Sequence, residues 1–153
     1  MRKIRNLTGM PVLCHRQKLG RLAQAQLSPD LKRLEGVWVD GGLRGARYIP
    51  AEQLGMIGEA VVIADAPGRR ARLKPEALSR RAVSTGGERL GAIVGAEVDE
   101  ISFLVGALEL SRGLWDDLRA GRTRVERYCA DAESGAVIVL DSARERDEKE
   151  DEE

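Results

Sequence analysis

Two stretches of the chain resemble each other at a fixed separation, and this internal repeat constrains the fold more than any other feature. Leu19-Gly20 returns as Leu90-Gly91, an offset of 71. The same offset takes apolar positions to apolar positions and a turn glycine to a turn glycine: Leu27 to Val98, Val37 to Leu108, Val39 to Leu110 and Gly42 to Gly113. Self-similarity of this length indicates duplicated units. We therefore expect one small fold used twice.

The separation grows in the later part of each copy. There the offset is 76, which maps Ile49 to Val125 and the run 60–63 to the run 136–139. The second copy therefore holds about five extra residues, which we place around Trp115-Asp116-Asp117 because lengthening a surface loop costs little.

Short segments in which apolar and polar residues alternate, separated by glycines, favour strands over long helices. Residues 19–27, 37–39 and 103–105 are the clearest examples. Turn signals such as Gly41-Gly42 and Gly86-Gly87 recur at the short spacing of a β-barrel or sandwich. One or two helical turns are expected at residues 50–57, behind Pro50, and at their counterpart 126–132. The fold class predicted is all-β.

Composition limits the core and the location. Two copies of about 65 residues would each be marginally stable alone, so they should pack together or oligomerise. Aromatic residues are only 3% of the chain. Trp115 could anchor an interface or close a barrel mouth, and the scarcity of aromatic residues favours the barrel mouth. Cys14 and Cys129 are far apart in the sequence, which favours buried free thiols in a reducing cytoplasm. We find no signal peptide and no membrane span, and predict a cytoplasmic protein.

Charge divides unevenly although the net charge is zero. Residues 1–80 hold 15 Lys or Arg and 7 Asp or Glu, whereas residues 81–153 hold 10 and 18. The two halves could pack against each other, pair head-to-tail in a homodimer, or present a basic face to nucleic acid. The last ten residues contain seven acids and no apolar residue, which predicts a disordered acidic tail over residues 143–153.

A basic segment lies between the copies. We interpret residues 67–80 as a solvated linker, with a short helix expected at Pro75–Leu78. Its cations could attract phosphate, but the segment has no interleaved aromatic residues on which bases could stack. The candidate phosphate-binding cations are Arg69, Arg70, Arg72, Lys74 and Arg80 of the linker and Arg81, the first residue of the second copy.

No pattern indicates catalysis or a cofactor. His15 is the only histidine, and in a strand it would point away from the adjacent Cys14, so we expect it at the surface or in a turn. Asp116-Asp117 could bind a divalent cation, but a ligand loop is lacking. Residues 41–45 match neither the dinucleotide fingerprint nor the P-loop. We predict no catalytic residues, metal or cofactor.

The inserted segment 111–118 is the candidate interaction surface. Trp and Arg are the residue types that anchor protein interfaces. The candidate interaction residues there are Arg112, Trp115, Asp116 and Asp117.

The order of these motifs resembles the PRC-barrel domain. In the first copy the resemblance rests on 7–12, Leu19-Gly20-x-Leu22, Val37-x-Val39, Tyr48-Ile49-Pro50 and the apolar run 60–63. The second copy offers Leu90-Gly91-x-Ile93, Leu108-x-Leu110 and the run 136–139, but has Val125-Glu126 in place of Ile-Pro. The two copies would occupy residues 1–66 and 81–142.

The resemblance implies two small, strongly bent antiparallel β-barrels in tandem, with Gly20 and Gly91 at turns or bends where a side chain would obstruct curvature. Family members dock onto other macromolecules, in photosynthetic reaction centres, in ribosome maturation and in proteins linked to sporulation, and share no catalytic residues. We therefore expect a non-enzymatic docking module with a protein partner. The alternatives are an RNA- or ribosome-associated assembly factor that uses the basic linker, and a small metal-binding protein.

Overall fold

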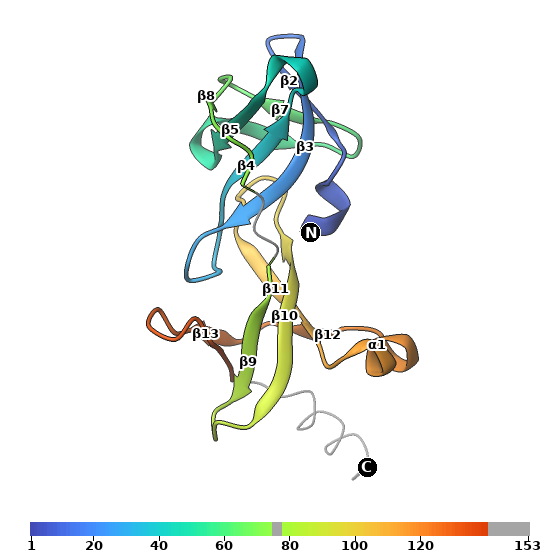
Figure 1. The fold of residues 1–153 in the computed structure, drawn as a ribbon, viewed down its shortest axis with the longest axis vertical. Coiled ribbons are helices and arrows are strands. Elements are labelled where there is room, and N and C mark those ends of the chain that lie inside the picture. Colours follow the sequence, from blue (N-terminus) through green and yellow to red (C-terminus); the bar gives the residue numbers. More distant parts are fainter. Residues whose placement is uncertain (75–77, 141–153) are drawn as a thin grey trace. The chain divides into compact units, whose positions relative to one another are not determined.

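The computed structural model describes residues 1–74 and 78–140, and strands dominate it, as predicted (Figure 1). Contacts divide the chain into two compact units. Unit 1 comprises Met1–Glu76 and Glu97–Val105, and unit 2 comprises Ala77–Ala96 and Gly106–Glu153. The acidic tail, and most of the helix expected at Pro75–Leu78, lie outside the described residues.

Unit 1 is built on a seven-stranded sheet with the order β6-β7-β2-β3-β4-β5-β8. Neighbouring strands are antiparallel except β2 and β7, which are parallel. The strands are β2 (Pro11–Cys14), β3 (Gln17–Leu27), β4 (Leu34–Asp40), β5 (Ala46–Pro50), β6 (Leu54–Ile57), β7 (Val62–Ala64) and β8 (Arg69–Arg70). Unit 1 also has three short 3-10 helices: η1 (Ile4–Leu7) precedes β2, η2 (Gly42–Arg44) joins β4 to β5, and η3 (Ala51–Gln53) joins β5 to β6.

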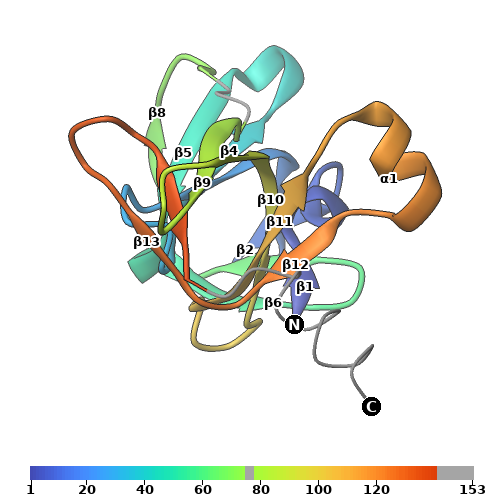
Figure 2. The ribbon, with the colours of Figure 1, turned by 90° about the horizontal axis from the view of Figure 1, so that it is seen from below.

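The second sheet has the order β12-β11-β10-β9-β14-β13, and both sheets curl (Figure 2). Here β9 and β14 are the parallel pair, so the expectation of purely antiparallel barrels is wrong for both sheets. The elements are β9 (Arg80–Ser84), β10 (Arg89–Val98), β11 (Val105–Ser111), α1 (Leu114–Ala120), β12 (Thr123–Val125), β13 (Tyr128–Ala130) and β14 (Val137–Val139). The short β1 (Arg2–Lys3) pairs with the end of β10 that belongs to unit 1.

Strands recur along the chain at the separation seen in the sequence. Strands β4 and β11 begin and end at positions related by the offset of the Leu-Gly motif, and β3 and β10 end at the equivalent Leu27 and Val98. The last strand corrects the offset predicted for it. Val62 in β7 and Val137 in β14 are both buried, and they pair with the equivalent strands β2 and β9. A shift of one position would turn the other face of the strand inward. The offset between these two strands is therefore 75 rather than 76.

Each repeat bends at the same glycine. Leu19 in β3 and Leu90 in β10 are the extra residues of β-bulges, where the pairing with β2 and β9 changes register. The next residues, Gly20 and Gly91, have φ values of +152° and +144°. A Cβ there would lie 2.1 Å from the carbonyl oxygen of Asp40 or of Ser111, respectively. Only glycine therefore fits at these bends.

One local prediction was wrong, and two were confirmed in part. The counterpart helix expected at residues 126–132 is instead the strand β13, Tyr128–Ala130, because pairing with β14 overrode local preference. The helical turn expected behind Pro50 is η3, Ala51–Gln53, and β6 follows it. Of the strand expected at 103–105, Leu104 forms a β-bridge and Val105 begins β11, whereas Phe103 has φ +62°.

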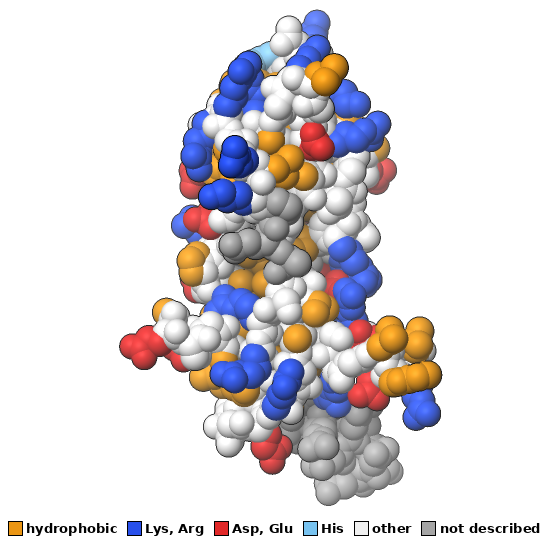
Figure 3. Space-filling model, in the orientation of Figure 1, with side chains coloured by type: hydrophobic (Ala, Val, Ile, Leu, Met, Phe, Trp, Pro, Cys, Tyr) orange, Lys and Arg blue, Asp and Glu red, His pale blue; other side chains and the backbone are white. Residues whose placement is uncertain are grey.

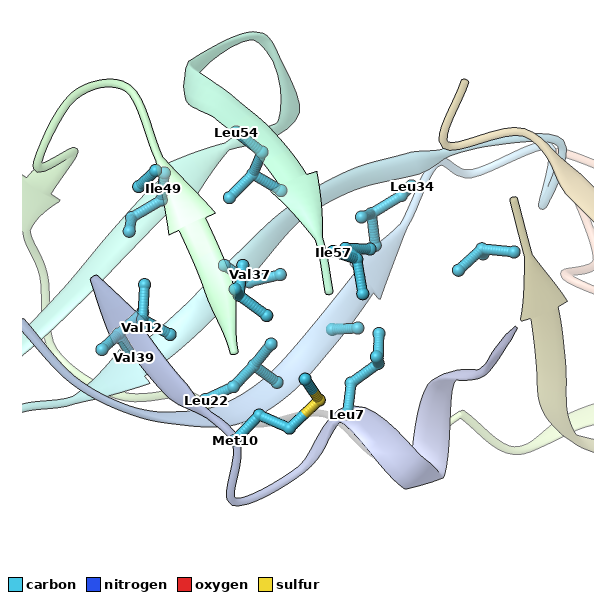
Figure 4. Packing of buried hydrophobic residues seen from close by; sticks show 14 of the residues in the cluster. Leu7, Met10, Val12, Leu22, Leu34, Val37, Val39, Ile49, Leu54 and Ile57 are labelled. Carbon is cyan, nitrogen blue, oxygen red and sulfur yellow. The ribbon is translucent and has the colours of Figure 1, made fainter. Parts of the chain in front are cut away.

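The core of unit 1 is aliphatic (Figure 4). Side chains from β2, β3, β4, β5, β6 and η1 meet inside the curled sheet. Val98, at the end of β10, belongs to the same cluster, and Phe103 and Val105 pack against it. The labelled members are Leu7, Met10, Val12, Leu22, Leu34, Val37, Val39, Ile49, Leu54 and Ile57.

Equivalent hairpin ends of the two repeats pair with each other inside unit 1. The Leu34 N–H donates to the Phe103 carbonyl at 2.8 Å, and the Val105 N–H donates to the Lys32 carbonyl at 2.9 Å. The two donors, Leu34 and Val105, are equivalent positions of the repeat, and so are the two acceptors. The β-bridge between Arg33 and Leu104 joins a third pair of equivalent positions. The second repeat thus supplies part of the first compact unit.

The bend glycines give a stability prediction. Gly20→Ala and Gly91→Ala should each lower the free energy of unfolding by about 3 kcal/mol, because the added methyl meets a backbone carbonyl and φ is strained. Gly86→Ala is the control, since its nearest atom would be 3.8 Å away, and should stay within about 0.5 kcal/mol. Urea unfolding of the three variants measures this; equal losses at all three positions would contradict it.

The shared hairpin gives a second prediction. A fragment of residues 1–79 lacks Val98, Phe103 and Val105 and leaves the Leu34 N–H without its acceptor. It should melt at a lower temperature than the intact chain, because buried apolar contacts and a backbone hydrogen bond are lost together. Thermal unfolding followed by circular dichroism tests this. A fragment as stable as the intact chain would show that the hairpin adds nothing to unit 1.

Candidate functional site

Helix α1 occupies the place where the second repeat is longer than the first. It joins β11 to β12, as the turn 41–45 joins β4 to β5 in the first repeat. The helix has seven residues, none of them buried. Gly121, with φ +73°, ends it and donates its N–H to the Asp117 carbonyl at 3.0 Å. The predicted insertion is therefore a helix rather than an irregular loop.

The apolar residues of α1 point to solvent. Leu114, Trp115 and Leu118 are 73%, 77% and 71% exposed, and their spacing of one and four residues places them on one side of the helix. Figure 3 shows this cluster of apolar side chains at α1. The expectation that Trp115 fills a barrel mouth is wrong. We call Leu114, Trp115 and Leu118 the α1 face.

Polar contacts, not apolar ones, fix the helix to its sheet. The Ser111 hydroxyl donates to Asp117 Oδ2 at 2.7 Å. Arg122 lies between two carboxylates, with Nη1 3.1 Å from Glu109 Oε2 and Nε 4.0 Å from Asp117 Oδ2. Glu109 is buried. Asp117 fixes one side of α1 to the sheet, so the side with Trp115 faces solvent. An ordinary surface helix does the opposite, because it packs its apolar side against the core.

The four predicted residues of this segment therefore have different roles. Arg112, Trp115 and Asp116 are exposed, and Arg119 adds a further exposed charge beside the α1 face. Asp117 is half-buried and serves to position the helix. Leu114 and Leu118 were not predicted as site residues. Their spacing with Trp115 was the signal, but it covers too few residues to identify a helix from sequence.

The structure distributes the basic segment over both units. Arg69 and Arg70 form the edge strand β8 of unit 1, while Arg80 and Arg81 lie in β9 of unit 2. Arg80 Nε donates to the Gly135 carbonyl at 2.6 Å. Arg72 and Lys74 lie outside the strands.

A second feature, absent from the sequence-based predictions, lies on the outer face of the first sheet. Trp38 and Tyr48 are cross-strand neighbours with ring centroids 4.8 Å apart. The Arg69 guanidinium lies 5.4 Å from the Tyr48 ring centroid, and Trp38 Nε1 donates to Gln26 Oε1 at 2.9 Å. Burial, followed by the nearby Glu35 carboxylate, raises the pKa of Tyr48. All of these side chains have partners, so the patch is mainly structural.

The equivalent pair in the second sheet is polar, and its Glu109 helps to anchor α1 through Arg122. Glu109 and Arg124 are cross-strand neighbours at the positions that Trp38 and Tyr48 occupy in the first sheet. Glu109 is the buried partner of Arg122, which also lies 4.0 Å from the Asp117 carboxylate of α1. A carboxylate in the place of an aromatic ring thus explains how the inserted helix is held without burying its own apolar residues.

The candidate reactive groups are separated or engaged in turns. Cys14 is buried, as predicted, but Cys129 is exposed, which corrects the expectation of two buried thiols. His15 is exposed in the β2–β3 turn, as predicted. Among the described residues, no three His, Cys, Asp or Glu side chains come together as metal ligands. Asp99 accepts backbone N–H bonds from Ser102 and Ile101, which lower the pKa of its carboxyl.

Comparison with known proteins adds no assignment. No family model matches the chain, and a search of curated proteins finds no significant match. Within residues 1–74 and 78–140, no helix has the length and apolar character needed to cross a membrane.

The two tryptophans report on this geometry. Trp115 is exposed, whereas Trp38 is half-buried and hydrogen-bonded to Gln26. Acrylamide should therefore quench the fluorescence of Trp38→Phe, which retains Trp115, several-fold more steeply than that of Trp115→Phe. Similar quenching slopes for the two variants would contradict the exposed position of Trp115.

Proposed function

We propose that this protein is a non-enzymatic docking module of two PRC-barrel-like repeats that binds a protein partner through the α1 face. The observation that carries the proposal is that three large apolar side chains, each more than 70% exposed, share one side of a helix held by polar contacts. A helix that buries none of its own residues gives the fold little apolar stabilisation. Its apolar side is available to a partner.

The chemistry of the surface indicates the kind of partner. Trp is the residue type most enriched at interface hot spots, and Leu114 and Leu118 flank it on the same side of α1. An amphipathic helix of this kind binds in an apolar groove of its partner. Arg112 and Arg119 are exposed beside the α1 face and form no ion pair within the described residues. We therefore propose a partner groove that is apolar with carboxylates at its rim.

The PRC-barrel assignment is part of the proposal. It is supported by the order of the motifs around Gly20 and Gly91, by the duplicated strand bounds, and by the bulge that recurs in both repeats. A cytoplasmic location is proposed with it. Fold resemblance does not identify the partner, so the α1 face carries the functional argument.

Photo-crosslinking at the α1 face tests the docking function. A photoreactive phenylalanine analogue in place of Trp115 should form an adduct of discrete mass with one partner protein in cells. Addition of Leu118→Asp should abolish that adduct, because a carboxylate would enter an apolar groove unpaired. The unfolding temperature should not change, since Leu118 is exposed.

Leu43 provides the matched control position because it is a fully exposed apolar residue in unit 1. The same photoreactive group at position 43 should give no such adduct. An adduct formed equally from both positions, or one that survives Leu118→Asp, would contradict docking through the α1 face. An adduct of twice the chain's mass would identify a second copy as the partner.

A further inference from the structure

We infer that an open groove in unit 1 binds the phosphodiester backbone of a nucleic-acid strand. The groove has a volume of about 460 Å³ and lies where β3 bends past the turn between β4 and β5. This site belongs to the first repeat, and the inference does not depend on docking through α1. The residues that line it are Lys18, Leu19, Gly20, Arg21, Asp40, Gly41, Gly42 and Arg44.

Three glycines line the groove between long basic side chains. Gly20, Gly41 and Gly42 contribute only backbone to its wall. A Cβ on Gly20 or Gly41 would lie within 2.5 Å of a backbone oxygen, of Asp40 and Gly45 respectively, so these two glycines let the bend and the turn pack closely. A Cβ on Gly42 would meet no atom within 4 Å, so a ligand can approach the backbone at that residue. The groove follows from the bend that shapes the sheet.

The charge of the groove is positive. Lys18, Arg21 and Arg44 are exposed cations in its wall, and Asp40 is its one acidic residue. The Asp40 carboxylate already accepts the Gly42 N–H at 2.8 Å. Arg16 lies nearby in sequence, in the exposed β2–β3 turn, and Figure 3 shows several Lys and Arg side chains at that end of unit 1.

Two of the three cations are held in place. Arg44 Nη1 donates to the Lys18 carbonyl at 3.3 Å, and Arg21 Nη1 donates to the Gly9 carbonyl at 2.9 Å. Each guanidinium keeps further N–H donors, because arginine has five. Preorganised guanidinium groups suit phosphate oxygens, which accept several hydrogen bonds at once.

The lining favours a strand's backbone over its bases and over a bilayer. The groove wall contains no aromatic side chain on which a base could stack, so contacts fall on phosphates and should be independent of sequence. A bilayer surface is flat and touches residues that protrude, whereas a flexible strand can follow a recess. Leu43 is a single exposed apolar tip, too little for stable insertion.

The second repeat does not preserve this chemistry. Lys18 corresponds to Arg89, but Arg21 corresponds to Ala92 and Asp40 to Ser111. The turn that holds Arg44 is replaced by α1. Only one of the three cations therefore remains at the equivalent place, and we expect the phosphate site in the first repeat alone.

Fluorescence anisotropy with a labelled single-stranded RNA of about 20 nucleotides tests the inference on the full chain. Three phosphate contacts predict that log K falls with log salt concentration at a slope of about −2. Lys18→Glu should weaken binding about tenfold at low salt. Arg44→Gln should make the slope shallower by about 0.7, the effect of one lost contact.

Arg89→Glu is the matched control, because it also places a glutamate at the equivalent exposed cation of the second repeat. It should alter affinity less than about twofold. Equal losses in Lys18→Glu and Arg89→Glu would overturn the site in favour of diffuse attraction. Binding to phosphatidylserine vesicles without binding to RNA would overturn it in favour of a membrane surface. A loss of RNA binding in Leu118→Asp would also overturn it, because that variant changes only the α1 face.

Discussion

The close approach of backbone to backbone at Gly20 and Gly91 determines how each repeat is built. In both, a glycine with positive φ follows the extra residue of a bulge, and the carbonyl of the facing strand occupies the space of a missing Cβ. Bulges bend a strand and increase its twist, which lets a sheet of short strands curl around an aliphatic core. A side chain at either position would force the two strands apart.

The same constraint locates both proposed surfaces. In the first repeat, the bend brings the connection between β4 and β5 beside the bulge of β3. In the second repeat, it brings the connection between β11 and β12 beside the bulge of β10. In the first repeat that connection is a glycine turn, and the groove with Lys18, Arg21 and Arg44 lies there. In the second repeat the connection is α1. One structural position thus holds a cationic groove in one copy and an apolar helix face in the other, while β4 and β11 beneath them have equal lengths.

The sequence predicted the features that depend on the spacing of apolar residues and glycines, but not those that depend on tertiary packing. The repeat, its strands and the exposed turn at His15 could be read from spacing and glycine positions. The parallel pairs could not, because β2 and β7 meet only after the sheet curls. Trp115 was expected to close a barrel mouth because aromatic residues are scarce in the chain, and it was a candidate interface anchor as well. Its exposure follows from Asp117, whose partners Ser111 and Arg122 come from flanking segments. The groove was equally invisible, since its cations come together only through the bend.

The hairpin end of the second repeat contributes to the compact unit of the first, which ties the two copies together within a single chain. Residues 97–105 belong to unit 1, and their hydrogen bonds join Leu34 to Phe103 and Val105 to Lys32. Because donors and acceptors are repeat equivalents, the same contact could form between two copies of an unduplicated ancestor. Joining the copies makes that contact intramolecular, which raises its effective concentration and frees the two repeats to acquire different surfaces.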